Sequence, residues 1–341
     1  MAATTARGVP VTRARGPVVR ALARPELGAV IAAVLIAGFF ATRTDQFATA
    51  AGLANVLDVT ATLGIMAVAV ALLLIGGEFD LSAGALTAST GLVTALLVNR
   101  LEVNIWEGIV WSLVFALAVG FVNGLVVTLT RLPGFIVTLG TLFALTGANV
   151  GVTKLLTDTV RVGAVDEAAG YDSARAVFAS SVTVEQGEFR VAILWWLGVT
   201  VVATGLLVRT KFGNWIFGVG GGAASARSAG VPVRRTKILL FMGTATAAWL
   251  VGTISLLRLT SVQADAGLGE EFTYIIAAVI GGCLITGGAG SAWGAALGAL
   301  IYGMTQQGIV FAQWDSDWFP LVLGGMLLAA VFINTLFVRR R

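Results

Sequence analysis

The chain has 341 residues, of which 57% are hydrophobic and only 12% charged, and its mean hydropathy is +0.91. Soluble domains carry about 25% charged residues, so this composition predicts an integral membrane protein with little soluble mass. The net charge of +4 comes from basic residues scattered at the ends of apolar runs, which indicates membrane topology and not a nucleic-acid partner. The chain has no histidine and one cysteine, which excludes histidine-based catalysis, histidine metal sites and an internal disulfide.

Apolar runs of membrane-spanning length recur along almost the whole chain. A helix needs about 20 mainly apolar residues to cross a bilayer. We expect an all-α membrane protein with about ten transmembrane helices, of which the first and eighth are short, tilted or broken. The ten runs cover residues 27–41, 57–76, 81–98, 106–130, 135–156, 191–208, 238–257, 273–286, 290–312 and 318–338.

The basic residues predict how these spans are oriented. If the N-terminus lies in the cytoplasm, 15 of the 22 Lys and Arg residues fall on the inner side. This excess predicts an even number of spans with both termini in the cytoplasm. The chain then consists of a basic segment over 1–26, a permease domain over 27–338 and a basic tail over 339–341. Within the permease domain, 157–190 is the main outer loop and 209–237 the main inner loop.

The segment from Ile75 to Gly84 interrupts two apolar runs with glycines, two carboxylates and a serine. In hydrocarbon, every backbone N–H and C=O must be paired internally, so such a break is tolerated only against protein or along a water-filled path. The break therefore predicts a transport path. Asp80 is placed to cap the helix that follows, and contact with a substrate or gate is the alternative.

The outer loop 157–190 mixes acidic residues with Val, Phe and Tyr, which favours some local structure. It is interpreted either as a solvated connector or as a docking surface for an external protein.

The inner loop 209–237 carries six Lys or Arg and no acid. Its run 213–222 is too apolar for a solvated loop, and 223–230 predicts a short helix that Gly230 and Pro232 end. A short helix that buries nothing by itself needs a partner; the alternative is that it lies on anionic lipid.

Nucleotide-binding signatures are weak or missing. Residues 218–223 match the glycine pattern of dinucleotide sites, but no strand precedes them, so that reading is rejected. No G-x-x-x-x-G-K-[ST] motif occurs. If ATP drives this protein, another chain must bind it.

Four stretches in order along the chain carry a resemblance to a known family. They are 76–84, 132–141, 234–237 and 280–299. From about residue 50 to 338 the chain resembles the permease subunit of bacterial ABC importers for simple sugars, of the ribose, xylose and fructose type. It departs from the family pattern in one extra residue before Asp80, in Gly222 where Asn is usual, and in Ala224 where Glu is usual.

This resemblance implies a type II-like importer permease in the bacterial inner membrane, with no reaction in this chain. It implies a second copy of the permease, a cytoplasmic ATP-binding subunit that holds ATP and Mg, and a periplasmic or lipid-anchored sugar-binding protein. This chain itself needs no cofactor and no metal. By analogy, the inner loop is the element that couples to the ATPase. Its expected coupling residues are Gly213, Asn214, Trp215, Gly220, Gly221, Ala226, Arg227, Gly230, Val231 and Pro232.

A sugar path needs polar groups that suit hydroxyls, without a strong binding site at mid-membrane. The candidates for the path or its gate are Asp80, Ser82, Asn123, Phe135, Thr138, Thr141, Ser291 and Gln306. Each polar candidate is equally explained by an interhelical hydrogen bond, since buried polar groups need partners. Phe135 is interpreted as a gate or as core. Glycine pairs four residues apart predict close helix packing at 120–124, 147–151 and 294–298.

Other functions are weighed against this one. An ion-coupled secondary transporter would want buried carboxylates in both halves, but only Asp58 and Asp80 qualify, both in the first half. A membrane enzyme lacks clustered catalytic groups. An ABC permease for another polar solute, such as branched-chain amino acids, would look similar.

Overall fold

The computed structural model describes residues 25–339. Most of the predicted basic N-terminal segment (1–24) and the tail residues 340–341 lie outside the described residues.

Each of the ten predicted runs falls on a helix. The helices are α2 (Pro25–Arg43), α3 (Ala50–Ile75), α4 (Ala83–Leu101), α5 (Ile105–Thr130), α6 (Gly134–Thr157), α8 (Ala192–Arg209), α10 (Val233–Leu259), α11 (Glu270–Ile280), α12 (Ala292–Phe311) and α13 (Phe319–Arg339). Within the described residues, α3, α5, α6, α8 and α10 are long and apolar enough to cross a membrane. The chain is therefore a mainly helical membrane protein, and the number of crossings stays a prediction.

The eighth run does not continue as a helix to residue 286 as predicted. Helix α11 ends at Ile280 because Gly281 and Gly282 follow, and Gly282 takes a positive φ of 95°. Residues 281–291 form a loop that leads into α12.

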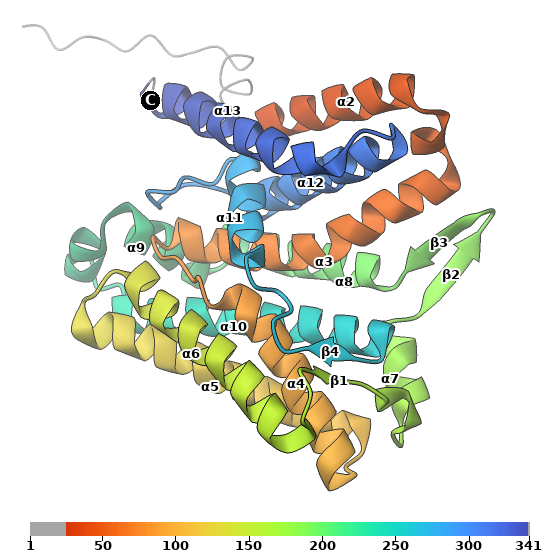
Figure 1. The fold of residues 1–341 in the computed structure, drawn as a ribbon. Helices are drawn as coiled ribbons and strands as arrows, with labels where there is room; N and C mark the ends of the chain where they lie inside the picture. The colour runs from red at the N-terminus through yellow and green to blue at the C-terminus, as the bar shows by residue number, and fades with distance from the viewer. Residues whose placement is uncertain (1–24, 340–341) are drawn as a thin grey trace, which may run out of the picture.

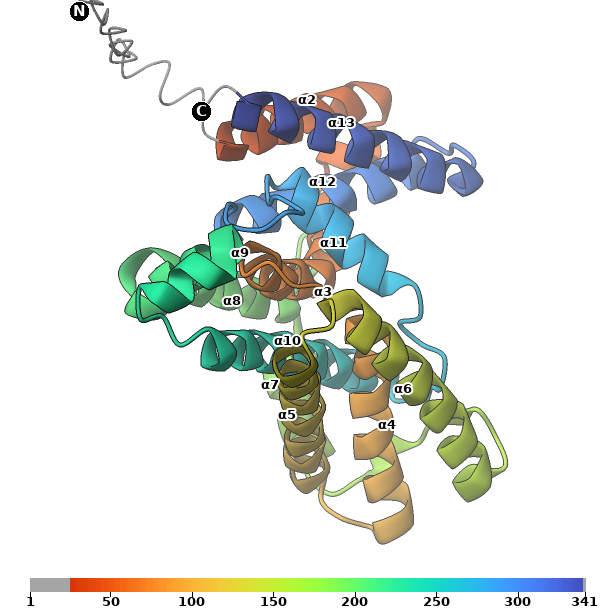
Figure 2. The same cartoon turned by 90° about the vertical axis from the view of Figure 1, so that its left-hand side faces the viewer.

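Helix α3 forms the centre of the bundle and packs against α8, α10, α11 and α12 (Figures 1 and 2). Its sequence is apolar on every side, which is typical of a helix surrounded by protein. Ile65, Met66 and Leu73 are fully buried.

Two of the three glycine pairs make the predicted close contacts. The pair at 120–124 lies against α10, and the pair at 294–298 lies against the end of α11. The pair at 147–151 has nothing within 4 Å of where a Cβ would stand. That face of α6 is therefore open in the single chain.

The outer loop is ordered. It contains β1 (Arg161–Val162), η2 (Val165–Glu167), α7 (Tyr171–Phe178) and a hairpin of β2 (Ser181–Val184) and β3 (Gly187–Arg190). Strand β1 pairs antiparallel with β4 (Val262–Gln263). The hydroxyl of Tyr171 donates to the carbonyl of Leu257 on α10 over 2.8 Å. The predicted local structure is confirmed, and the docking role stays a prediction.

The remaining short elements are η1 (Asp45–Ala48), η3 (Ser316–Trp318) and α9 (Lys211–Ser228), which belongs to the predicted inner loop. Figure 1 shows the start of α2 and the end of α13 at the same end of the bundle as α9, with α7 and the β2–β3 hairpin at the opposite end. This arrangement agrees with the predicted loops on opposite sides. Which end faces the cytoplasm stays a prediction.

Candidate functional site

The predicted break after α3 is built by a glycine turn. Gly77 takes φ +80°, a left-handed conformation that glycine adopts without strain, and the N–H of Glu78 donates back to the carbonyl of Leu73 over 3.1 Å. The end of α11 repeats this geometry, with the N–H of Cys283 donating to Ala278 over 3.1 Å. Two helices thus end in the same Ile-Gly-Gly cap.

Polar residues after this break form one buried network across three helices. The N–H and hydroxyl of Ser82 donate to Asp80 Oδ1 over 2.9 and 2.5 Å. Asn123 on α5 donates to the Ser82 hydroxyl over 3.0 Å, and Thr141 on α6 donates to Asn123 over 2.6 Å. The Thr138 hydroxyl accepts the N–H of Leu81 over 3.0 Å.

The structure therefore brings together five of the predicted path residues, but it buries four of them and partly buries Thr141. Asp80, Ser82, Asn123 and Thr138 are at most 2% exposed. Their hydrogen bonds join the start of α4 to α5 and α6, which is the interhelical role weighed above. Their part in a path stays a prediction.

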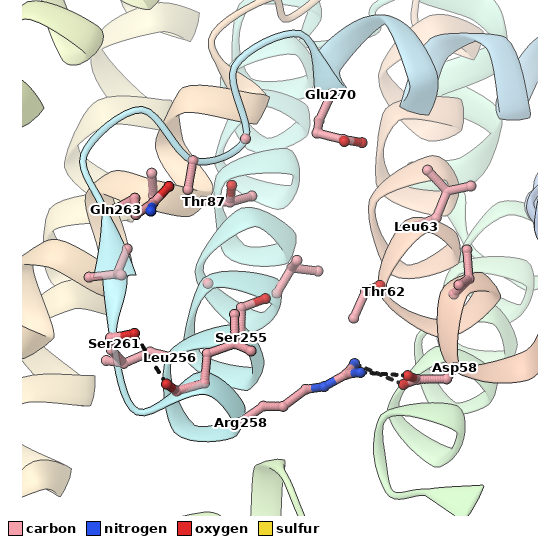
Figure 3. Close-up of a pocket in the computed structure, with 18 of the residues that line it drawn as sticks. Asp58, Thr62, Leu63, Thr87, Ser255, Leu256, Arg258, Ser261, Gln263 and Glu270 are labelled. Carbon is pink, nitrogen blue, oxygen red and sulfur yellow. Dashed lines mark hydrogen bonds and ion pairs between the residues drawn. The ribbon is translucent and has the colours of Figure 1, made fainter. Parts of the chain in front are cut away.

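A polar cavity of about 630 Å³ opens between α3, α4, α10, α11 and α12, on the side of the bundle that carries β4 (Figure 3). Hydroxyl, amide and carboxylate groups face it from widely separated parts of the chain. Its polar lining includes Thr62, Thr87, Ser255, Gln263, Glu270, Tyr274, Tyr302 and Gln306. Among the predicted path residues, only Gln306 lines it. Such a lining provides many hydrogen-bond donors and acceptors with little net charge.

An ion pair spans one end of this cavity. Arg258 at the end of α10 contacts Asp58 on α3 with both terminal nitrogens, at 2.8 and 3.0 Å, and Arg190 of β3 approaches the same carboxylate at 3.4 Å. Figure 3 shows this pair at the opposite end of the cavity from Glu270. Asp58, considered above as an ion-coupling carboxylate, is thus held by two arginines.

Glu270 begins α11, which at 11 residues is too short to cross a bilayer. Its side chain lines the cavity. Partial burial raises the pKa of its carboxyl, and the neighbouring carboxylate of Glu271 raises it further. Sequence reasoning missed Glu270 and both cavity tyrosines. Two adjacent carboxylates directly before an apolar run were the available signal.

Helix α9 contacts, through glycines, the turn after α3 and the loop that follows α11. A Cβ on Gly220 would overlap the carbonyl oxygen of Ile75 and stand 2.7 Å from the nitrogen of Gly288. A Cβ on Gly288 would stand 2.9 Å from the Cα of Gly221. The N–H of Gly288 donates to Ile75 over 2.9 Å. We call this meeting of Gly77, Gly220–Gly221 and Gly287–Gly288 the glycine junction.

The other predicted coupling residues occupy several environments. Gly213 is buried at the start of α9, where its N–H binds the Thr210 hydroxyl over 3.1 Å. Asn214 and Arg227 are exposed, and Trp215 is half-buried. Ala226 and Val231 pack in a small apolar cluster.

The predicted end of the short helix is confirmed. Helix α9 ends at Ser228, Gly230 takes φ +82°, and Pro232 is the residue that precedes α10. The preceding run 213–222, for which no helix was predicted, is also helical and bends at Gly222.

Two further path candidates lie elsewhere. Ser291 caps α12 by accepting the N–H of Gly294 over 3.0 Å. Phe135 lies on the open face of α6 and is 48% exposed, so it is not core in the single chain. The structure does not bring either residue to the cavity of Figure 3.

Comparisons with known proteins agree with a transport role. Residues 52–331 match the family described as "Branched-chain amino acid transport system / permease component". The chain is 31% identical over 317 residues to the ribose import permease protein RbsC of Escherichia coli strain K12, covering 91% of this chain and 93% of that protein. It is 30% identical to the inner membrane ABC transporter permease protein YjfF (84% of each chain) and 29% identical to the xylose transport system permease protein XylH (92% of each), both from the same strain. No solved structure matches.

A mainly helical bundle with a partly polar cavity and matching relatives defines a membrane permease, a transport subunit and not a catalytic enzyme. The chain belongs to the family of branched-chain amino acid transport system permease components.

Proposed function

We propose that the chain is the membrane permease of an ABC importer that carries a small sugar, a pentose or a hexose. The observation that carries this proposal is the likeness to the ribose import permease over more than nine-tenths of both chains. The xylose transport permease is similar over the same extent.

The chemistry of the cavity in Figure 3 supports a sugar as the transported substrate. Its hydroxyl, amide and carboxylate groups suit the many hydroxyls of a sugar, and the apolar part of the lining suits the C–H face. The cavity lies on the β4 side of the bundle, at the end away from α9. A binding protein that docks on α7 and the β2–β3 hairpin would deliver sugar at this end.

Helix α9 is proposed as the element to which a cytoplasmic ATPase transmits its conformational change. The glycine junction supports this role, because any displacement of α9 at Gly220 presses directly on the backbone of Ile75 and Gly288. Asn214 remains exposed on the same helix for contact with a partner. The α9 end then faces the cytoplasm, and both termini lie there.

A second copy of the chain is proposed to cover α6. This helix exposes Leu139 and Phe143 beside the open glycine pair at 147–151. Small residues let helices of two chains approach closely, and the apolar neighbours add contact area.

Uptake by cells tests the substrate. We expect deletion of this gene to abolish accumulation of radiolabelled ribose or xylose, and the restored gene to recover it. Leucine uptake serves as the parallel measurement, because the family description names branched-chain amino acids. Loss of leucine uptake with normal pentose and hexose uptake would overturn the sugar proposal.

A further inference from the structure

A second cavity, of about 420 Å³, lies at the α9 end of the bundle and shares no lining residue with the cavity of Figure 3. It is enclosed by the turn between α5 and α6, the break after α3, the last part of α9 and the start of α10. Its charged lining residues are Glu78, Arg131, Arg227, Arg234 and Lys237. Basic residues thus outnumber the single acid by four to one.

The charges in this basic pocket do not cancel. Lys237 forms an ion pair with Glu78, and both side chains are largely buried. Arg131, Arg227 and Arg234 are exposed and form no ion pair within residues 25–339. Three guanidinium groups from three different segments therefore surround one cavity without an anion.

Two helix starts add to the positive potential. Helix α6 begins after Pro133 and α10 after Pro232, and neither start has a side-chain cap. Glu78 Oε2 lies next to Gly134 and so faces the positive end of α6. Glu78 is the one acidic side chain among the described lining residues, and it already pairs with Lys237 of α10. Free N–H groups at a helix start favour a bound phosphate.

Apolar side chains lie directly beside these cations. Leu132 and Phe135 line the same pocket and are 46% and 48% exposed. The pocket also lies where the candidate spans α5, α6 and α10 begin or end, and lipid head groups lie at the ends of spanning helices. A surface that combines arginines with exposed apolar groups at this depth matches a phospholipid better than it matches an acidic protein surface.

We propose that the basic pocket holds the phosphate group of an anionic membrane lipid, with the acyl chains lying along Leu132 and Phe135. Guanidinium groups recognise phosphate with paired N–H donors, which Lys cannot reproduce. A phosphate between Arg131, Arg227 and Arg234 would tie the α5–α6 turn to α9 and α10. The lipid would therefore brace the segment that carries the glycine junction.

The test uses the full-length chain, purified from its membrane with the partners it retains and then depleted of lipid. Short-chain phosphatidylglycerol, phosphatidylcholine and inorganic phosphate are added separately at equal ionic strength. Binding is measured by native mass spectrometry and by the shift of the melting temperature. The variants are Arg131→Gln and Arg234→Gln. Arg235→Gln is the matched control, because Arg235 is the exposed neighbour of Arg234 but does not line the pocket.

We expect phosphatidylglycerol, and not phosphatidylcholine, to bind and to raise the melting temperature of the wild type and of Arg235→Gln. Each pocket variant should weaken phosphatidylglycerol binding about fivefold, which corresponds to one lost charge at the membrane surface. Equal binding by pocket variants and control would overturn the proposal. Stabilisation by inorganic phosphate alone would assign the pocket to a free anion. Unchanged lipid binding with loss of a co-purified ATP-binding chain would assign it to protein docking.

Discussion

Replacing Gly220 with Ala tests the glycine junction directly. The new Cβ would overlap the carbonyl oxygen of Ile75 and stand 2.7 Å from the nitrogen of Gly288. Both neighbours are backbone atoms, so no side chain can rotate out of the way. The hydrogen bond from Gly288 to Ile75, 2.9 Å long, runs through the same spot.

The size of the effect follows from this geometry. Ordinary van der Waals contact begins near 3.4 Å, so Gly288 must retreat by about 0.7 Å and Ile75 by more. Overpacking of this kind costs about 1–3 kcal/mol of stability. On the same helix, Gly218 has only the Cβ of Ala226 nearby, at 3.9 Å. Gly218→Ala should gain up to about 1 kcal/mol through helix propensity, so the two variants should change stability in opposite directions.

Two assays separate folding from coupling. Melting of the purified protein measures stability, and proteoliposomes that also contain the ATP-binding chain and the binding protein measure uptake per ATP hydrolysed. We expect Gly220→Ala to melt earlier and to lose uptake per ATP, while Gly218→Ala melts later than the wild type and keeps its uptake per ATP. Gly220→Ala with the stability and uptake of Gly218→Ala would show that the close contacts at the junction do not matter.

Three further changes address the network and the cavity. Ser82→Ala removes the hydroxyl that donates to the buried Asp80 carboxylate and that accepts from Asn123, while the backbone N–H of residue 82 still donates to Asp80. Stability should fall by about 1–3 kcal/mol, and an unchanged melting temperature would refute this. Arg258→Gln breaks the pair with Asp58, but because the side chains are 33% and 15% exposed the loss should stay near 1 kcal/mol and shrink with salt, as a double-mutant cycle would measure. Glu270→Gln removes a carboxyl whose pKa is higher in the folded chain than the ordinary Glu value of 4.5. The contribution of this group to stability is therefore fully present below pH 4.5 and is lost as the pH rises through the folded-state pKa. The variant should flatten the fall in melting temperature that begins just above pH 4.5, and an identical pH profile would contradict the assignment.

The helices could be predicted from sequence because their signal is local. An apolar run of sufficient length specifies a spanning helix wherever it lies in the chain. The break at 76–82 was also visible, since glycines and carboxylates interrupt such a run. The eighth run is short, as expected, but its end was placed at residue 286 and not at 280, because the apolar residues Cys283, Leu284 and Ile285 follow the Gly281–Gly282 turn.

The cavity could not be predicted because its members are far apart in the chain. Asp58 and Arg258 are 200 residues apart, and each looks like an ordinary loop-end charge in sequence. Polar residues inside apolar runs, such as Asn123 and Thr141, indicated that hydrogen-bond partners must lie nearby. Only the packing of α4, α5 and α6 shows that they partner one another.

The repeated Ile-Gly-Gly cap explains how one helix can act on most of the bundle. Helices α3 and α11 end in the same turn, and α9 lies against both of the segments that follow. The segment after α3 enters α4, whose start is tied to α5 and α6 by the Asp80 network. The segment after α11 enters α12, whose first turn is fixed by Ser291. Because the contacts at the glycine junction join backbone to backbone, no rotamer change can absorb a displacement of Gly220. We infer that a push on α9 moves the starts of α4 and α12 together, and these two helices line the cavity of Figure 3 from different sides.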